Sequence, residues 1–347
     1  MKENNTRNYG IDFMRVVLII FIIIHHILLR GPISLRLLIN SEFQNGNVLF
    51  LIINAYLVIS VNCFFLISGY FGIHRNYKKL IKLCVSVYII YYIVNLLFLI
   101  SKGQRVNSEL IKGFLFPISQ YWFVFVYIVI SFIAPYLEVM LKNITITEQK
   151  YLILFSVCIW CIYAFLIDNP ILGGNRGYSV MFALILYIIG NYLKRKDRTL
   201  NTRISIFIFL GSSLFNGLLA IGAVFMGKQS LAWQLFSYNN PLVLIGAISF
   251  FCLFLHLEGC IVYRLSKFGK YAIYIYIYHS TPILANWYMQ LITEICGNDK
   301  LKFVVVSILT TMLLFLSGML VGILYEILWS SIIGKFNRLP VFKNKKG

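Results

Sequence analysis

Two adjacent histidines, His25 and His26, stand inside a long apolar stretch near the start of the chain. The same stretch carries Arg15 eleven residues before His26, and Asp12 three residues before the arginine. Ionisable side chains are costly in apolar surroundings, so their presence in a hydrophobic segment suggests a function. A neutral imidazole can act as a general base toward an alcohol, or can itself accept an acyl group. The pattern therefore indicates acid–base or acyl-transfer chemistry centred on His26.

A helical conformation would place Arg15 and His26 on one face. At about 100° per residue their separation returns to within roughly 20° of the same direction, whereas His25 is turned away by about 80°. The rise between the two is about 16 Å, so Arg15 and His26 mark the ends of one stripe and do not touch. Asp12 and Arg15 are spaced to form an ion pair. A histidine pair that only satisfies hydrogen bonds between helices remains an alternative.

The elements that hold these residues are expected to be membrane-spanning helices. Of the 347 residues, 60% are hydrophobic and 12% are charged, against about half and a quarter in soluble domains. Mean hydropathy is +0.81. Apolar blocks of about 20 residues can cross a bilayer core of roughly 30 Å as helices. The sequence predicts an all-α, polytopic transmembrane bundle of about ten spans, at residues 13–29, 48–72, 80–100, 119–141, 151–168, 178–193, 204–226, 239–257, 271–292 and 303–329.

The net charge of +19 invites a nucleic-acid partner, but the positions of the charges argue against one. With a cytoplasmic N-terminus, most Lys and Arg fall on the inner side of the predicted spans, including the cluster at 194–203 and the C-terminal tail. This bias follows the positive-inside rule and places both termini in the cytoplasm. Anionic lipid headgroups are sufficient partners for most of the charge, so we expect membrane lipids and no nucleic acid.

A second candidate site is basic. Arg75, Lys78, Lys79 and Lys82 lie at the cytoplasmic entrance of the predicted span 80–100. Lysine and arginine bind phosphate by charge and hydrogen bonding, so the cluster suits a polyphosphate ligand. Membrane orientation and contact with lipid headgroups explain the same residues equally well.

Polar and aromatic residues in four other spans are further candidates. Ser68 precedes a glycine, which allows a helix or a ligand to approach closely, and Trp122 stands where an outer aromatic belt is expected. Tyr278 precedes His279 midway through the ninth span, and Glu326 is an isolated carboxyl group in the last. Each of these residues is equally compatible with a polar contact between helices.

The remaining motifs suggest packing rather than a cofactor site. Gly318 and Gly322 have the GxxxG spacing of closely packed helices. Among the seven cysteines, Cys158 and Cys161 have no second Cys or His pair, so no metal is expected. No soluble domain or internal repeat is evident, and we expect residues 1–347 to form a single membrane-embedded domain.

The order of these motifs resembles that of acyltransferase family 3, membrane proteins that O-acetylate cell-surface glycans. The resemblance covers essentially the whole chain, and the motifs are short but occur in the family's order. The family pattern of an Asp, an Arg three residues on and a His eleven beyond it is similar to Asp12, Arg15 and His26. The other similar segments are Phe64–Tyr70, Tyr121–Phe123 followed by Pro135, and the IYIYHSTPI segment around His279.

The resemblance implies transfer of an acyl group, most often acetyl from acetyl-CoA, to a hydroxyl of a cell-surface or lipid-linked saccharide at the bacterial plasma membrane. His26 would act as general base or acyl carrier, and Arg15 and Asp12 would be further catalytic residues. Acetyl-CoA or another acyl-CoA would be a substrate, and no permanently bound cofactor is expected. The donor would be held by Arg75, Lys78, Lys79 and Lys82, and the saccharide by Ser68, Trp122, Tyr278 and His279.

One departure from the family concerns the basic cluster. The family usually has arginines there, whereas this chain has Lys78, Lys79 and Lys82, with Arg75 upstream. Lysine keeps the positive charge but loses the bidentate fork, which puts any specific arginine contact in doubt. Partner proteins of polysaccharide synthesis are compatible with the resemblance, and the oligomeric state is left open.

Two other classes of function compete with the enzyme. In a transporter or flippase, the intramembrane Arg, His and Glu side chains would line a path for a proton, a glycan or a lipid-linked intermediate. We find no inverted repeat and no paired broken helices in corresponding halves of the sequence, which argues against this class. A non-catalytic membrane scaffold is the weaker alternative.

The charge bias gives a test of topology. Tags after Gly347 and within 194–203 should be cytoplasmic, and a tag within 30–47 should be external, because the basic segments stay inside. Labelling of each tag with a membrane-impermeant reagent in intact cells measures this. Labelling of the 194–203 segment from outside would contradict both the number of spans and the depth expected for His26.

Overall fold

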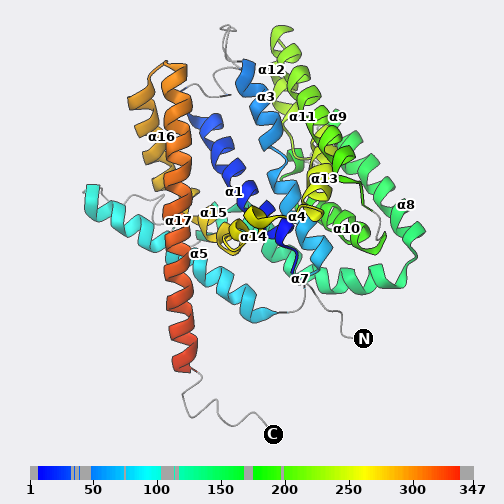
Figure 1. Ribbon diagram of the computed structural model, residues 1–347, viewed down its shortest axis with the longest axis horizontal. Helices are drawn as coiled ribbons and strands as arrows, with labels where there is room; N and C mark the ends of the chain where they lie inside the picture. Colours follow the sequence, from blue (N-terminus) through cyan, green and yellow to red (C-terminus); the bar gives the residue numbers. More distant parts are fainter. Residues whose placement is uncertain are drawn as a thin grey trace.

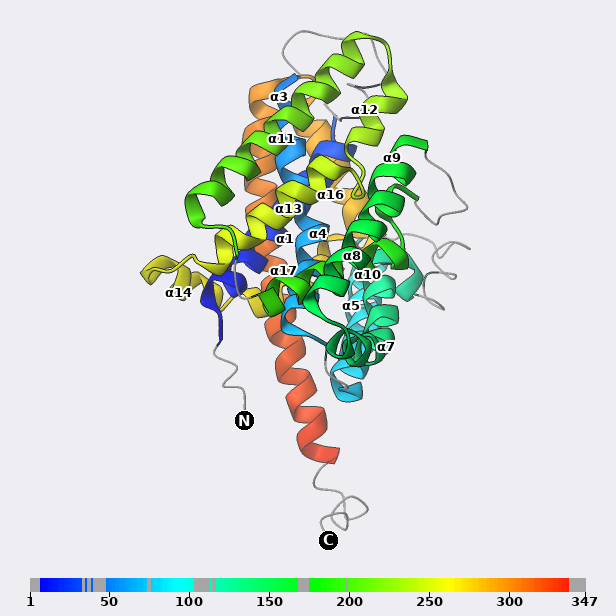
Figure 2. The ribbon, with the colours of Figure 1, turned by 90° about the vertical axis from the view of Figure 1, so that its right-hand side faces the viewer.

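The computed structural model describes residues 7–32, 35, 39, 48–73, 76–102, 113, 117–167, 175–196 and 199–336. Regular structure in these ranges is helical, and no strand occurs within them (Figure 1). The longer helices run alongside one another, and the C-terminal helix extends beyond the rest of the bundle (Figure 2). The all-helical class expected from the sequence is therefore confirmed.

Fifteen named α-helices make up most of the described chain. They are α1 (Tyr9–Arg30), α3 (Val48–Leu57), α4 (Ser60–Phe71), α5 (Tyr77–Lys102), α7 (Trp122–Asn143), α8 (Ile146–Val157), α9 (Ala164–Ile167), α10 (Val180–Lys196), α11 (Thr202–Phe225), α12 (Gln229–Leu235), α13 (Pro241–Leu255), α14 (Cys260–Ser266), α15 (Ala272–His279), α16 (Pro282–Cys296) and α17 (Lys300–Phe336). Short 3₁₀ or π turns occur at η1 (Pro117–Gln120), η2 (Cys158–Tyr163), η4 (Asn175–Gly177) and η5 (Gly269–Tyr271).

Seven helical segments of the described part are long and apolar enough to cross a membrane. An eighth results if the bent pair Pro241–Leu255 and Cys260–His279 is one span. Of the other predicted spans, 178–193 corresponds to α10, which has 17 residues, and 271–292 is divided between α15 and α16. The chain is thus a multi-pass membrane protein. The count of ten spans and the side of the membrane on which the termini lie stay predictions. Residues 1–6 and 337–347 lie outside the described ranges.

Pro282 explains the division of the ninth predicted span. It occupies the first turn of α16, where its fixed φ fits and its missing N–H is not needed. The residue before a proline is disfavoured in the helical region, and Thr281 accordingly has φ −59° and ψ 122°. His279 therefore becomes the last residue of α15 instead of lying inside a continuous helix.

Helix α1 lies in the middle of the bundle, between α17 on one side and α3 and α4 on the other (Figures 1 and 2). It also packs against α13, α14 and α15. Many of its apolar side chains are accordingly inaccessible, with Met14, Leu18, Ile23 and Ile27 fully buried. Of its ionisable side chains, His25 is buried and Asp12, Arg15 and His26 are partly buried, whereas Arg30 at the helix end is exposed.

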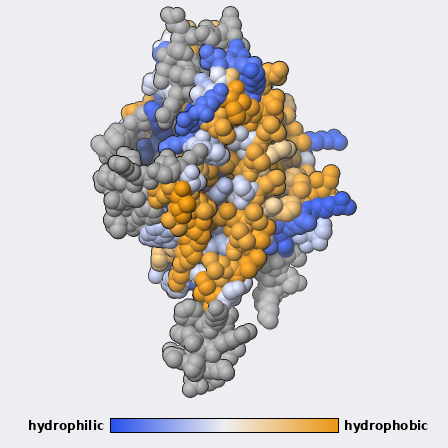
Figure 3. All heavy atoms as spheres, turned by 90° about the vertical axis from the view of Figure 1, so that its left-hand side faces the viewer, coloured by the Kyte–Doolittle hydropathy of each residue, from blue (hydrophilic) through white to orange (hydrophobic). Residues whose placement is uncertain are grey.

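The outer helices present the surface expected to meet lipid. Figure 3 shows apolar side chains over much of one face of the molecule. Among the outer helices, α5 exposes Leu97 and Ile100, and α17 exposes Leu309 and Leu313. Exposure of large apolar side chains on the outside of a helical bundle costs little free energy in a bilayer, because lipid chains are as apolar as leucine.

Glycines set the closest approaches between helices. A Cβ atom at Gly69 of α4 would overlap the backbone carbonyl of Tyr187 in α10, and one at Gly190 would overlap the carbonyl of Leu66. On the other side of the molecule, Gly318 and Gly322 of α17 bring this helix against α15. The packing role expected for the GxxxG pair is therefore what the structure shows.

Replacement of Gly69 tests the approach between α4 and α10. Gly69→Ala should destabilise the protein by about 1–3 kcal/mol, because backbone atoms of α10 cannot turn aside as a side chain can. Gly211→Ala in α11 is the matched control: nothing lies within 4 Å of the added methyl group, and alanine favours a helix by about 0.5–1 kcal/mol. Thermal unfolding in detergent measures both. Equal melting temperatures for the two variants would contradict the assigned contact.

Candidate active site

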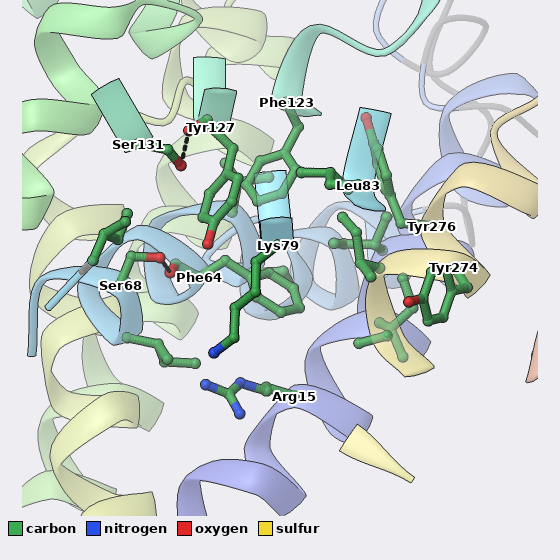
Figure 4. A pocket seen from close by; sticks show the side chains of 18 of the residues that line it. Arg15, Phe64, Ser68, Lys79, Leu83, Phe123, Tyr127, Ser131, Tyr274 and Tyr276 are labelled. Atoms are coloured by element: carbon green, nitrogen blue, oxygen red, sulfur yellow. Dashed lines mark hydrogen bonds between the residues drawn. The ribbon is translucent and has the colours of Figure 1, made fainter. Parts of the chain in front are cut away.

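A cavity of about 770 Å³ opens among the central helices. Its walls come from α1, α4, α5, α7 and α15, which the sequence separates widely. Arg15, His25 and His26 of α1 all line it. Figure 4 shows Arg15 and Lys79 reaching toward each other, with Phe64, Phe123 and Tyr127 on the surrounding helices. The stripe expected on α1 thus faces a single cavity.

His26 is paired with His279. Nδ1 of His26 lies 3.2 Å from Nε2 of His279, and the two ring centroids are 5.2 Å apart. His279 is fully buried, and its Nδ1 lies 2.8 Å from the carbonyl oxygen of Ile275, one turn earlier in α15. Sequence reasoning treated these two histidines as separate candidates. The structure brings them together from helices that are far apart in the chain.

His25 takes a different partner. Its Nδ1 lies 2.5 Å from Oδ1 of Asn54 in α3, and its side chain is buried. The His25 and His26 rings are 6.0 Å apart. Adjacent histidines on one helix thus engage different neighbours, as their angular separation requires. Asn54 was not among the sequence candidates.

Arg15 is held by Asp12. Nη1 of Arg15 lies 2.5 Å from Oδ1 of Asp12, and the other carboxylate oxygen accepts a bond from Nε of Arg7 at 2.6 Å. Arg7 precedes the helix; its hydrogen bond to Asp12 and the charge of that carboxylate raise the pKa of the Arg7 guanidinium. Arg15 lines the cavity, whereas Asp12 does not. Asp12 therefore orients the arginine from behind.

The four basic candidates separate in the structure. Lys79 and Lys82 line the cavity; Lys78 is exposed and does not line it. Arg75 lies outside the described residues. Lys270, which lies outside the predicted basic cluster, also lines the cavity. The cationic part of the wall therefore comes from three segments rather than from one cluster.

Glu326 is not isolated, contrary to its appearance in the sequence. Its Oε2 accepts a bond from Nζ of Lys82 at 2.5 Å, and its Oε1 accepts one from the Tyr274 hydroxyl at 2.6 Å. The charge of Lys82 is thus neutralised by a carboxylate of α17. Lys79, the other lysine of α5 in the cavity wall, is therefore the better candidate to bind an anionic ligand.

Of the residues expected to bind the saccharide, some line the cavity and others do not. Ser68 lines the cavity, and its hydroxyl donates a bond to the Phe64 carbonyl at 2.9 Å. Trp122 lines it together with Tyr238, the two rings being stacked with centroids 5.7 Å apart. Tyr278 does not line the cavity; its ring lies beside Gly318 of α17.

Comparison with known protein families decides the family. Residues 8–330 match the acyltransferase domain that defines acyltransferase family 3. The chain belongs to acyltransferase family 3. The family resemblance seen in the sequence is therefore confirmed, and the match includes each residue that lines the cavity. No curated protein and no solved structure is significantly similar to the chain.

The geometry of this acyltransferase-3 domain suits proton transfer and anion binding. Imidazole rings and cationic side chains share one cavity, and both histidines of α1, His25 and His26, line it. Within the described ranges, no group of three or more His, Cys, Asp or Glu side chains is placed to hold a metal ion. The chemistry available to this member of the family comes from the histidine, the cations and the aromatic wall.

Proposed function

We propose that this acyltransferase transfers an acyl group, typically acetyl, from an acyl-CoA to a hydroxyl of a cell-surface or lipid-linked saccharide in the bacterial plasma membrane. The observation that carries the proposal is the cavity that holds His26 together with the cations Arg15 and Lys79. Such a cavity accommodates a donor with a charged end and a long apolar arm.

The donor would enter with its phosphates at the cationic end. Arg15 and Lys79 reach toward each other there, and Lys270 lies in the same wall. Arginine and lysine bind phosphate oxygens by charge-assisted hydrogen bonds. Along α1 the distance from this end to His26 is about 16 Å, which a thin pantetheine arm can span. The thioester would then lie near the imidazole.

His26 would act on the acceptor hydroxyl. As general base, it takes the hydroxyl proton while the oxygen attacks the thioester carbonyl, and the proton then passes to the departing CoA thiolate. As nucleophile, it attacks the thioester carbonyl and expels the CoA thiolate to form an acyl-imidazole, and attack by the hydroxyl then transfers the acyl group and releases the imidazole. Both routes use an unprotonated ring nitrogen that faces the cavity.

The aromatic part of the wall suits a saccharide. Trp122 and Tyr238 line the cavity with stacked rings, and Tyr178 lies against Trp122 with centroids 4.6 Å apart. Flat aromatic surfaces with few polar groups orient a ligand by shape. We assign the acceptor to this aromatic part of the wall because the donor phosphates are assigned to the cations.

Replacement of each α1 histidine tests the reaction. His26→Ala should lower acyl transfer by roughly 10²–10⁴-fold through loss of the base. His25→Ala is the neighbouring control and should lose activity only in proportion to protein lost, because His25 is bonded to Asn54. Purified protein in liposomes, with labelled acetyl-CoA and a saccharide acceptor, gives transfer per folded protein.

The same assay discriminates the competing class. Movement of the acceptor across the liposome membrane without labelling would favour a flippase over the enzyme. Normal transfer by His26→Ala would remove His26 from the catalytic centre.

Replacement of neighbouring lysines tests the donor site. Lys79→Gln should raise KM for acetyl-CoA by about tenfold, the loss of one charge-assisted contact, and leave kcat nearly unchanged. Lys78→Gln, one residue away and outside the cavity wall, should change neither constant. Lys82 is unsuitable as a probe because its removal would leave Glu326 without its cation. Equal effects of the Lys78 and Lys79 variants would place the donor elsewhere.

A further inference from the structure

A hydrogen-bonded chain runs from the His26 ring through the His279 ring to the backbone carbonyl of Ile275. We infer that His279 is a positioning residue that fixes the tautomer of His26, so that Nδ1 of His26 carries the proton and Nε2 is the reacting nitrogen. The inference deepens the proposed acyl transfer and rests on it for its catalytic consequence, although the tautomer itself does not.

The direction of each bond follows from the last acceptor. A carbonyl oxygen only accepts, so Nδ1 of His279, 2.8 Å from the Ile275 oxygen, must carry a hydrogen. In a neutral imidazole the other nitrogen is then an acceptor, and Nε2 of His279 has a lone pair. Nδ1 of His26, 3.2 Å from that lone pair, must donate to it. Nε2 of His26 consequently has no hydrogen.

The remaining contacts of His279 agree with this direction. The Ser280 hydroxyl oxygen lies 3.2 Å from Nε2 of His279 and can donate to the same lone pair. Protonation of both His279 nitrogens would place a cation on a fully buried side chain whose ring nitrogens contact a carbonyl, an imidazole and a hydroxyl. Such a charge is costly without a carboxylate partner.

The place of His279 in the fold makes the orientation rigid. His279 ends α15, so its ring bonds a carbonyl of its own helix while Pro282 starts α16 three residues later. Gly318 and Gly322 allow α17 to press against α15 from behind. His279 is fully buried and does not line the cavity, unlike His26. It therefore acts through His26, which differs from the saccharide contact expected from the sequence.

The proton balance of the proposed reaction is consistent with this arrangement. Nε2 of His26 takes the acceptor proton and becomes part of an imidazolium, while Nδ1–H keeps its bond to His279. That bond is now charge-assisted and stronger. Nε2 then returns the proton to the CoA thiolate. His279 neither gains nor loses a proton at any step.

Two amide variants of equal chemistry test the role. In His279→Gln, the side-chain oxygen reaches the former Nε2 position and can accept from His26. In His279→Asn, the amide reaches only the former Nδ1 position, beside the Ile275 carbonyl. We expect the Gln variant to keep kcat within about tenfold, and the Asn variant to lose roughly 10²–10⁴-fold with little change in KM, as expected for a mis-set imidazole. Equal kcat for the two variants would overturn the inference.

A second measurement does not depend on catalysis. In protein labelled with ¹⁵N-histidine, the His26 signals, identified by their loss in His26→Ala, should show hydrogen on Nδ1 and none on Nε2. The Asn variant should shift His26 toward the other tautomer, while His25, bonded to Asn54, stays unchanged. Hydrogen on Nε2 of His26 in the unaltered protein would overturn the inference. Absence of acyl transfer in the unaltered protein would contradict only the proposed function, because the tautomer is read directly.

Discussion

A bilayer offers no hydrogen-bond partner to an ionisable side chain, so each such group in a span must find its partner within the protein, on its own helix or on a neighbouring one. The polar contacts of this protein are therefore also the contacts that fix its helices. His25 ties α1 to α3 through Asn54, and His26 ties α1 to α15 through His279. Lys82 ties α5 to α17 through Glu326. The cavity lies among the helices that these contacts connect, with residues of α1, α5 and α15 in its wall.

Local relations along one helix could be predicted from the sequence. The pairing of Asp12 with Arg15, and the different directions of His25 and His26, depend only on helical geometry, and the structure shows both. The family was recognisable because its motifs occur in order along the chain, and the match over residues 8–330 confirms it.

Relations between helices could not be predicted in the same way. His26 and His279 are separated by 253 positions and Lys82 and Glu326 by 244, and which residues meet depends on the tilt and register of packed helices. Hydropathy alone also gave a continuous ninth span. The division of this span could have been predicted from Pro282, because a proline disfavours the helical conformation at the residue before it. The same proline indicates that the helix carrying His279 ends close to that histidine.

The choice of a second histidine behind His26 follows from the same constraint. In soluble enzymes a buried carboxylate commonly orients a catalytic imidazole and stabilises its cation. A carboxylate at this depth would add a charge that the bilayer disfavours before any substrate binds. In the proposed arrangement, a neutral imidazole that ends on the Ile275 carbonyl sets the tautomer through neutral groups alone. The orientation of the proposed base is thereby linked to the helical backbone of α15, against which α17 packs closely.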